Sequence, residues 1–107
     1  MLADTPIDLD DMRTAADAAC RLMKALSNPD RLLLLCQLSQ GELRVGELEE
    51  RLHIVQPTLS QQLAVLRDEG LVTTRREGKH IHYRVASPQA LAVLGVLYQQ
   101  FCSINKE

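Results

Sequence analysis

Three cysteines and two closely spaced histidines are the side chains of this sequence that could react with small molecules or bind a metal. Cys20, Cys36 and Cys102 lie far apart along the chain and form no C-x-x-C pair. No Gly-rich cofactor loop accompanies them, so the motifs of a thiol-redox enzyme are missing. Cytosolic cysteines of this kind are by default small core side chains without chemistry.

The two histidines, His80 and His82, alternate with apolar residues and are expected on one exposed strand face. An H-x-H spacing can hold a metal, but by itself it is a weak signal. Contact with solvent or phosphate is the simpler expectation. We therefore predict no metal site and no cofactor.

Uncharged polar side chains cluster at the start of a predicted helix in the segment QPTLSQQLAVLRDEG, residues 56–70. Three leucines of this segment face inward at helical spacing, whereas the exposed positions carry hydroxyl and amide groups. Solvated helix faces usually carry Glu and Lys, and hydroxyl and amide groups are suited to base edges and phosphates. The predicted DNA-reading residues of this helix are Gln56, Thr58, Ser60, Gln61 and Gln62.

Basic residues are concentrated in a second segment, although the net charge of the chain is −2. The segments LVTTRR and HIHYRV alternate and are joined by Glu77-Gly78-Lys79, which predicts a β-hairpin. A weakly acidic protein with one basic projection can still bind phosphate through that projection. The predicted contacts of this hairpin with DNA are Arg75, Arg76, Lys79, His80 and Arg84.

The remaining elements place these two segments in a recognisable order. Apolar periodicity predicts a helix over 10–27, capped by Asp10 or Asp11, and a second helix capped by Asn28. A short strand precedes two helices within 45–69, which are joined by a tight turn, and Gly70 ends the second of them. The hairpin covers 71–85, and Ser87 caps a last helix over 88–104. The predicted fold is mainly α with a small β-hairpin wing, a winged helix-turn-helix.

Chain length and composition set limits on the domain count and the location. The 107 residues form a single domain, 1–107, and only three of them are aromatic. A core of this kind is marginal, so burying further surface in a homodimer would stabilise it. No signal peptide or membrane span is visible, so we expect a cytoplasmic protein without a membrane partner.

The chain resembles the ArsR/SmtB family of bacterial winged-helix repressors over about residues 12–103. The segments that carry the resemblance, in order, are ALSNPDRLLLLCQL, LRVGELEERL, QPTLSQQLAVLRDEGLVTTRREGKHIHYRV and the closing helix. The resemblance implies a homodimer, with 10–27 and 88–104 as dimerisation helices and the QPTLSQQL helix in the major groove of an inverted-repeat operator. Arg44 departs from the family, because many relatives have a capping Ser there, so a weaker start of the third helix is expected.

Many members of this family sense metals, and two familiar metal sites can be tested against the sequence. The thiolate site needs cysteines flanking Val45, where Arg44 and Gly46 stand. The zinc site needs Asp, Glu or His on the last helix, and residues 87–104 contain none. Both sites are missing, which makes a metal the less favoured inducer.

Cys36 and Cys102 resemble the thiol pair of the family's sulfide- and persulfide-responsive branch, whereas Cys20 is interpreted as structural. This resemblance implies a DNA-binding repressor that low-molecular-weight persulfides switch through a Cys36–Cys102 disulfide or polysulfide. A disulfide needs Cα atoms about 4.4–6.8 Å apart, and each inserted sulfur relaxes that requirement by about 2 Å.

Several alternatives stay open at this point. Within the regulator hypothesis, peroxide, general thiol oxidation or a metal ion could be the signal. Outside it, the chain could be a thiol-redox enzyme or a winged helix used only for protein contacts. The neutral polar helix face and the basic hairpin favour DNA, and we do not expect an enzyme.

Overall fold

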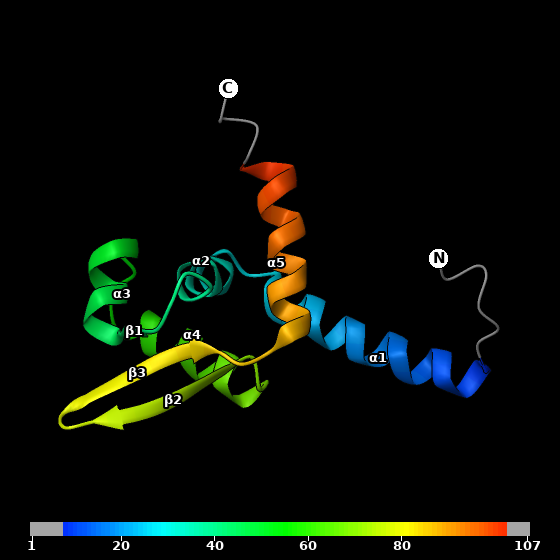
Figure 1. The fold of residues 1–107 in the computed structure, drawn as a ribbon, viewed down its shortest axis with the longest axis horizontal. Coiled ribbons are helices and arrows are strands. Elements are labelled where there is room, and N and C mark those ends of the chain that lie inside the picture. Colours follow the sequence, from blue (N-terminus) through cyan, green and yellow to red (C-terminus); the bar gives the residue numbers. More distant parts are fainter. Residues whose placement is uncertain (1–7, 103–107) are drawn as a thin grey trace.

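A computed structural model describes residues 8–102 of the chain. Five helices and three short strands follow one another in the order α1, α2, β1, α3, α4, β2, β3, α5 (Figure 1). Their bounds are α1 Leu9–Leu26, α2 Pro29–Leu38, β1 Leu43–Arg44, α3 Val45–Leu52, α4 Thr58–Asp68, β2 Val72–Glu77, β3 His80–Val85 and α5 Pro88–Phe101. The predicted element order, including the short strand before the third helix, is confirmed. Positions 103 and 104 of the predicted last helix lie outside the described residues.

The core surrounds α2, which contacts α1, α3, α4 and β3. It is built almost entirely from aliphatic side chains, as the scarcity of aromatic residues requires. The fully buried members are Leu34, Leu35, Leu48, Leu59, Leu63 and Leu66. The leucines of α4 that were predicted to face inward therefore do so, and their burial leaves the opposite face of that helix exposed.

Local capping signals explain most of the helix boundaries. The side chains of Asn28 and Ser87 accept the backbone N–H groups of Arg31 and Ala90, both at 3.0 Å, and each is followed by a proline. Gly70 has a φ of 75° just beyond α4, a conformation that glycine adopts without strain. These predicted caps are confirmed.

Two helix starts differ from the prediction. The cap of α1 is Asp8, whose carboxylate accepts the Asp10 N–H at 3.1 Å, so the assignment to Asp10 or Asp11 was wrong. Periodicity alone could not separate three nearby aspartates. At α3 the Glu47 carboxylate accepts the Arg44 N–H at 2.8 Å, which stabilises the start although Arg44 cannot cap it.

The three strands form one antiparallel sheet in the order β1-β3-β2. β1 pairs with β3 through Leu43 and Tyr83, and β2 pairs with β3 from Val72–Val85 to Glu77–His80. The β2–β3 hairpin is a long ribbon that runs beside α4 and α3, and its tip extends past α3 (Figure 1). The combination of α3, α4 and this hairpin is a winged helix-turn-helix.

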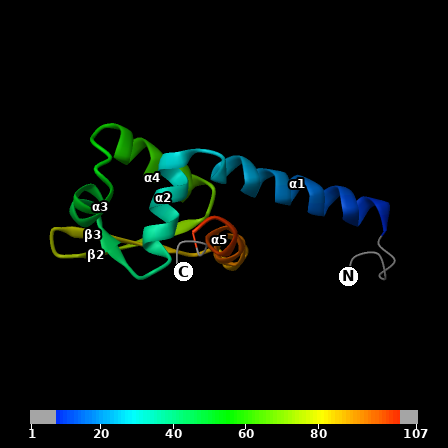
Figure 2. The same cartoon turned by 90° about the horizontal axis from the view of Figure 1, so that it is seen from above.

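The helix α1 projects away from the rest of the chain as an isolated rod, and α5 stands beside α2 (Figures 1 and 2). Almost all of α1 is exposed, and only Ala25 and Leu26 at its end are buried. None of the helices described within residues 8–102 is long and apolar enough to cross a membrane.

Candidate nucleic-acid interface and thiol pair

The N-terminal part of α4 presents the polar side chains that were predicted to read DNA. Two of them interact with each other, because Gln56 Oε1 accepts hydrogen bonds from the Ser60 backbone N–H at 3.1 Å and from Ser60 Oγ at 2.7 Å. The helix begins at Thr58, and Pro57 before it has no capping side chain. The Gln56 side chain, one residue before the N-cap position, therefore satisfies a free N–H group in the first turn of α4.

Gln62 also has a protein partner, since its Oε1 accepts a hydrogen bond from the Arg31 guanidinium at 2.9 Å. Gln62 is half-buried. By contrast, the side chains of Thr58 and Gln61 form no hydrogen bond with other residues in the described range 8–102. Gln61 is exposed, so among the predicted base-reading residues it is the one whose amide is available to a ligand.

The strand register divides the predicted wing residues between the two faces of the hairpin. Arg75 pairs with His82, and Glu77 pairs with His80, so these side chains share a face with Arg84. Arg76 pairs with Ile81 and lies on the opposite face, while Lys79 is in the turn. The basic residues of the wing are therefore not one continuous row.

Arg75 is held by a carboxylate from outside the hairpin. Its Nε donates to both oxygens of Glu42, at 3.0 and 2.9 Å, and its guanidinium also lies 3.5 Å from Glu77 Oε1. The hydrogen bond from Arg75 lowers the pKa of Glu42 below its usual value, with smaller contributions from the nearby charges of His82 and Arg84. Arg75 thus joins the wing to the residue before β1.

His82 differs from the expected exposed position. Its side chain is only 16% exposed, and its ring nitrogens lie 3.9 Å from Glu42 and 3.4 Å from Glu77. His80 is exposed and lies 3.4 Å from an Arg44 guanidinium nitrogen. Within residues 8–102 no group of three or more metal-ligating side chains is arranged to hold an ion. The His-x-His pair therefore divides between an inner and an outer position.

The predicted thiol pair lies on α2 and at the end of α5. Cys36 and Cys102 are both free and retain exposed surface. Partial burial raises the pKa of the Cys36 thiol, and the neighbouring Cys102 raises it further. The fold therefore places these two thiols, which are far apart in sequence, within the range of an electrostatic interaction.

Two residues that the sequence analysis did not select have structural roles at this surface. Glu42 holds Arg75, and Arg31 connects α2 to the end of α1 and to α4. Arg31 has a recognisable signal in the sequence, because it is the only basic residue of the largely apolar helix PDRLLLLCQL. Glu42 has no comparable signal, since it is one of several acidic residues near α3.

The fold and the polar face of α4 define the class of protein, which is a winged helix-turn-helix of the kind that binds duplex DNA. Residues 28–74 match the model of the family described as bacterial regulatory protein, arsR family. The chain is 46% identical to the biofilm growth-associated repressor of Agrobacterium fabrum, over 96% of each chain. The chain belongs to the ArsR family of bacterial transcription regulators, and the predicted family is confirmed.

Two further similarities extend the comparison. The transcriptional activator HlyU of Vibrio cholerae is 40% identical to this chain, over 98% of this chain and 97% of HlyU. A structure of reduced HlyU superposes with a TM-score of 0.83 and 41% identity, over 88% of this chain and 99% of the HlyU chain. A homodimeric winged helix-turn-helix domain from Mycobacterium bovis superposes with a TM-score of 0.76 and 28% identity, over 95% of this chain and 94% of the other. These relatives are regulators rather than enzymes, in agreement with the prediction.

Proposed function

We propose that the chain is a homodimeric repressor that binds an inverted-repeat operator and is released from it by persulfides. In this proposal α4 enters the major groove, the wing contacts the flanking backbone, and Cys36 and Cys102 form the sensor. The sensor part is supported by the placement of two exposed thiols, Cys36 on α2 and Cys102 at the end of α5, and by the electrostatic influence of Cys102 on the pKa of Cys36.

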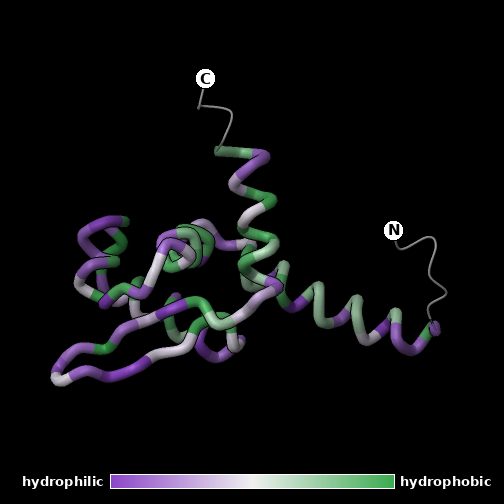
Figure 3. The backbone as a smooth tube through the Cα atoms, in the orientation of Figure 1, coloured by the Kyte–Doolittle hydropathy of each residue, from purple (hydrophilic) through white to green (hydrophobic). Residues whose placement is uncertain are grey.

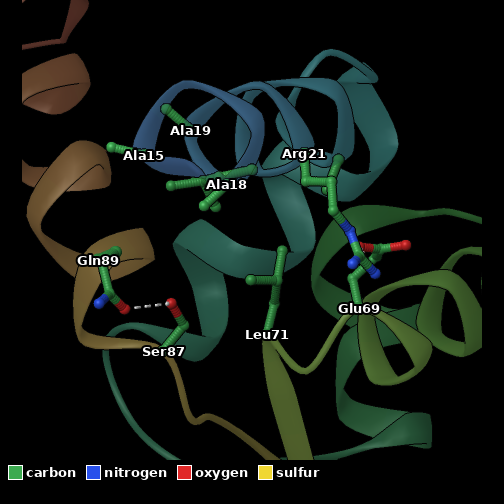
Figure 4. A pocket seen from close by; sticks show the side chains of 10 residues that line it. Ala15, Ala18, Ala19, Arg21, Glu69, Leu71, Ser87 and Gln89 are labelled. Carbon is green, nitrogen blue, oxygen red and sulfur yellow. Dashed lines mark hydrogen bonds and ion pairs between the residues drawn. The ribbon is translucent and has the colours of Figure 1, made fainter. Parts of the chain in front are cut away.

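The homodimer is supported by apolar surface that one protomer leaves uncovered. Apolar residues recur along α1 and α5, as the green stretches of both helices show (Figure 3), and several of their side chains are exposed. They include Leu9, Met12 and Met23 on α1 and Leu91, Val96 and Phe101 on α5. A groove of about 570 Å³ lies between α1 and the start of α5, lined by alanines and leucines together with four polar residues (Figure 4). A second copy presenting the same helices would cover this surface. The similar winged helix-turn-helix domain from Mycobacterium bovis is homodimeric.

The proposed DNA contacts use side chains of two kinds. Gln61 and Thr58 on α4 are placed to contact base edges or nearby phosphates. Arg76, Lys79, His80 and Arg84 on the exposed hairpin are proposed to contact the backbone, which fixes register without reading sequence. Arg75 is proposed to support DNA binding indirectly, because its hydrogen bond to Glu42 joins the wing to the residue before β1.

The proposed chemistry begins at the exposed thiol of Cys102. Its thiolate attacks the outer sulfur of a low-molecular-weight persulfide, RSSH; the S–S bond breaks and RS⁻ leaves, so that Cys102 carries a persulfide. The Cys36 thiolate then attacks Cys102 Sγ and expels HS⁻, which leaves a disulfide. The sulfane sulfur is reduced to sulfide as the two thiols are oxidised.

A longer bridge forms when both cysteines carry a persulfide. The terminal sulfur of the Cys36 persulfide attacks Cys102 Sγ, HS⁻ leaves, and the product is a trisulfide. The longer bridge relaxes the distance that a disulfide requires. Either bridge would tie α2 to α5, and because α5 belongs to the proposed dimer interface, the separation of the two α4 helices would change. Operator binding needs that separation near one helical turn, about 34 Å.

The test is to treat the reduced protein with glutathione persulfide or with peroxide and to measure mass and operator affinity together. We expect persulfide to add bridging sulfur between Cys36 and Cys102 and to weaken operator binding by about 5- to 150-fold. Cys36→Ser and Cys102→Ser should bind DNA normally without responding, whereas Cys20→Ser should respond like the natural protein. Unchanged operator affinity after persulfide treatment contradicts the sensor mechanism and leaves the DNA-binding proposal standing.

A further inference from the structure

We propose that Arg31 is a positioning residue that fixes the recognition helix α4 relative to the dimerisation helix α1. This inference rests on the proposed function, because it assigns α4 to DNA and α1 to the dimer. It concerns a side chain on α2, the same helix that carries Cys36.

Arg31 is bound first to the end of α1. Its Nε donates to the Ala25 carbonyl at 2.6 Å, and one terminal nitrogen donates to the Lys24 carbonyl at 3.2 Å. These carbonyls belong to the last turn of a helix that ends at Leu26, where carbonyl groups lack partners within the helix. The Lys24 carbonyl also accepts from the Ser27 N–H and hydroxyl, so the Ala25 carbonyl is the one that depends on Arg31. A cation is also favoured at this end of α1 by the helix dipole.

The other terminal nitrogen of Arg31 reaches α4. It donates to Gln62 Oε1 at 2.9 Å, in a half-buried position between the helices. A guanidinium has only donors, so the Gln62 amide must turn its oxygen toward Arg31. Gln62 therefore cannot offer both its oxygen and its NH2 to an adenine, and its interaction with Arg31 is better described as positioning than as base reading.

A second polar contact joins the same two helices farther along. Arg21 on α1 pairs with Glu69 at the C-terminal end of α4 at 3.2 Å, and the two side chains meet at the edge of the groove (Figure 4). The Arg21 side chain is largely exposed, so this pair alone contributes little. Together the two contacts hold α4 at its middle and at its C-terminal end, with a hollow of about 150 Å³ between them.

The consequence concerns the spacing of the two half-sites on DNA. In a dimer built on α1, the distance and angle between the two α4 helices depend on how rigidly each α4 is attached to α1. Arg31 bonds to both helices, and its backbone moves with α2. A bridge that pulls α2 toward α5 would therefore act on the attachment of α4 directly.

The experiment compares spacing preference rather than affinity alone. The probe is the inverted repeat that the natural protein selects from random duplexes, together with versions whose spacer is longer or shorter by about two base pairs. We expect the natural protein to lose about ten-fold or more in affinity when the spacer changes, which corresponds to a mismatched site. Arg31→Met should remain dimeric and should lose most of this preference.

A matched control is available on α3. Arg51 donates to Gln37 on α2 at 3.4 Å, so Arg51→Met removes the same charge and another Arg–Gln contact without touching α1 or α4. This control should keep the spacing preference of the natural protein. If it loses the preference as Arg31→Met does, charge rather than geometry explains the effect and the proposal is overturned.

Gln62→Leu is a second test of the same link in case Arg31→Met does not fold. It removes the hydrogen bond between Arg31 and α4 and leaves the Arg31 hydrogen bonds to α1 in place. It should also weaken the spacing preference. A folded Arg31→Met or Gln62→Leu dimer that keeps the natural preference overturns the role of Arg31 while the proposed function stands. A natural protein that selects no inverted repeat overturns both.

Discussion

Arg75 on β2 donates hydrogen bonds to both carboxylate oxygens of Glu42, which lies just before β1, at 3.0 and 2.9 Å. The pair therefore connects the residue before β1 to the middle of β2. It also engages a cation that the sequence suggested for DNA. The arginines at 75 and 76 are adjacent in sequence, but they point to opposite faces, and only Arg75 is bound in this way.

Glu42→Gln should release Arg75 for phosphate. Because a bound cation displaces counterions from DNA, the plot of log affinity against log salt should become steeper by about one unit. Fluorescence anisotropy with an unrelated duplex at several salt concentrations measures this slope. An unchanged slope would mean that Arg75 stays away from DNA even without its carboxylate.

Arg76→Ala should have the opposite effect on the same measurement. Arg76 is exposed and faces away from Glu42, so we expect its loss to weaken operator and random duplex similarly and to flatten the salt dependence by about one unit. A loss restricted to the operator would instead make Arg76 a base-reading residue.

Gln61→Ala should affect sequence recognition. The Gln61 amide is exposed at the start of α4, and an amide of this kind contributes about 1–3 kcal/mol of discrimination between bases. We expect a loss of that size on the operator and little change on random DNA, measured at a single salt concentration. Equal losses on both duplexes would show that Gln61 reads no base.

The alkylation rate of Cys36 should depend on pH in a way that reports its neighbour. Because burial and Cys102 raise the Cys36 pKa above the ordinary 9.0, the rate with iodoacetamide should keep rising beyond the pH at which an ordinary thiol levels off. Cys102→Ser removes the neighbouring thiolate and should shift the profile to lower pH. Peptide mass spectrometry resolves Cys36 from the other cysteines, and an unshifted profile would place the two thiols out of contact.

Local sequence patterns account for most of the secondary structure of this protein. The spacing of leucines, the Asn28-Pro29 and Ser87-Pro88 caps, and Gly70 specify the helices, because each signal acts within a few residues. The alternation in HIHYRV likewise predicts a strand. The same locality explains the error at Asp8, since competing caps close together differ only in the geometry that the folded chain selects.

Contacts between distant residues were decided only by the tertiary structure. The sequence marks Gln62 and Arg75 as exposed polar side chains, and the fold gives them partners 31 and 33 positions away, Arg31 and Glu42. It also turns His82 inward and places Cys102 within electrostatic range of Cys36. Periodicity shows which face of a helix or strand a residue occupies. Which charged group or thiol contacts that residue depends on how the helices and strands pack against one another, and no single segment of the sequence specifies this packing.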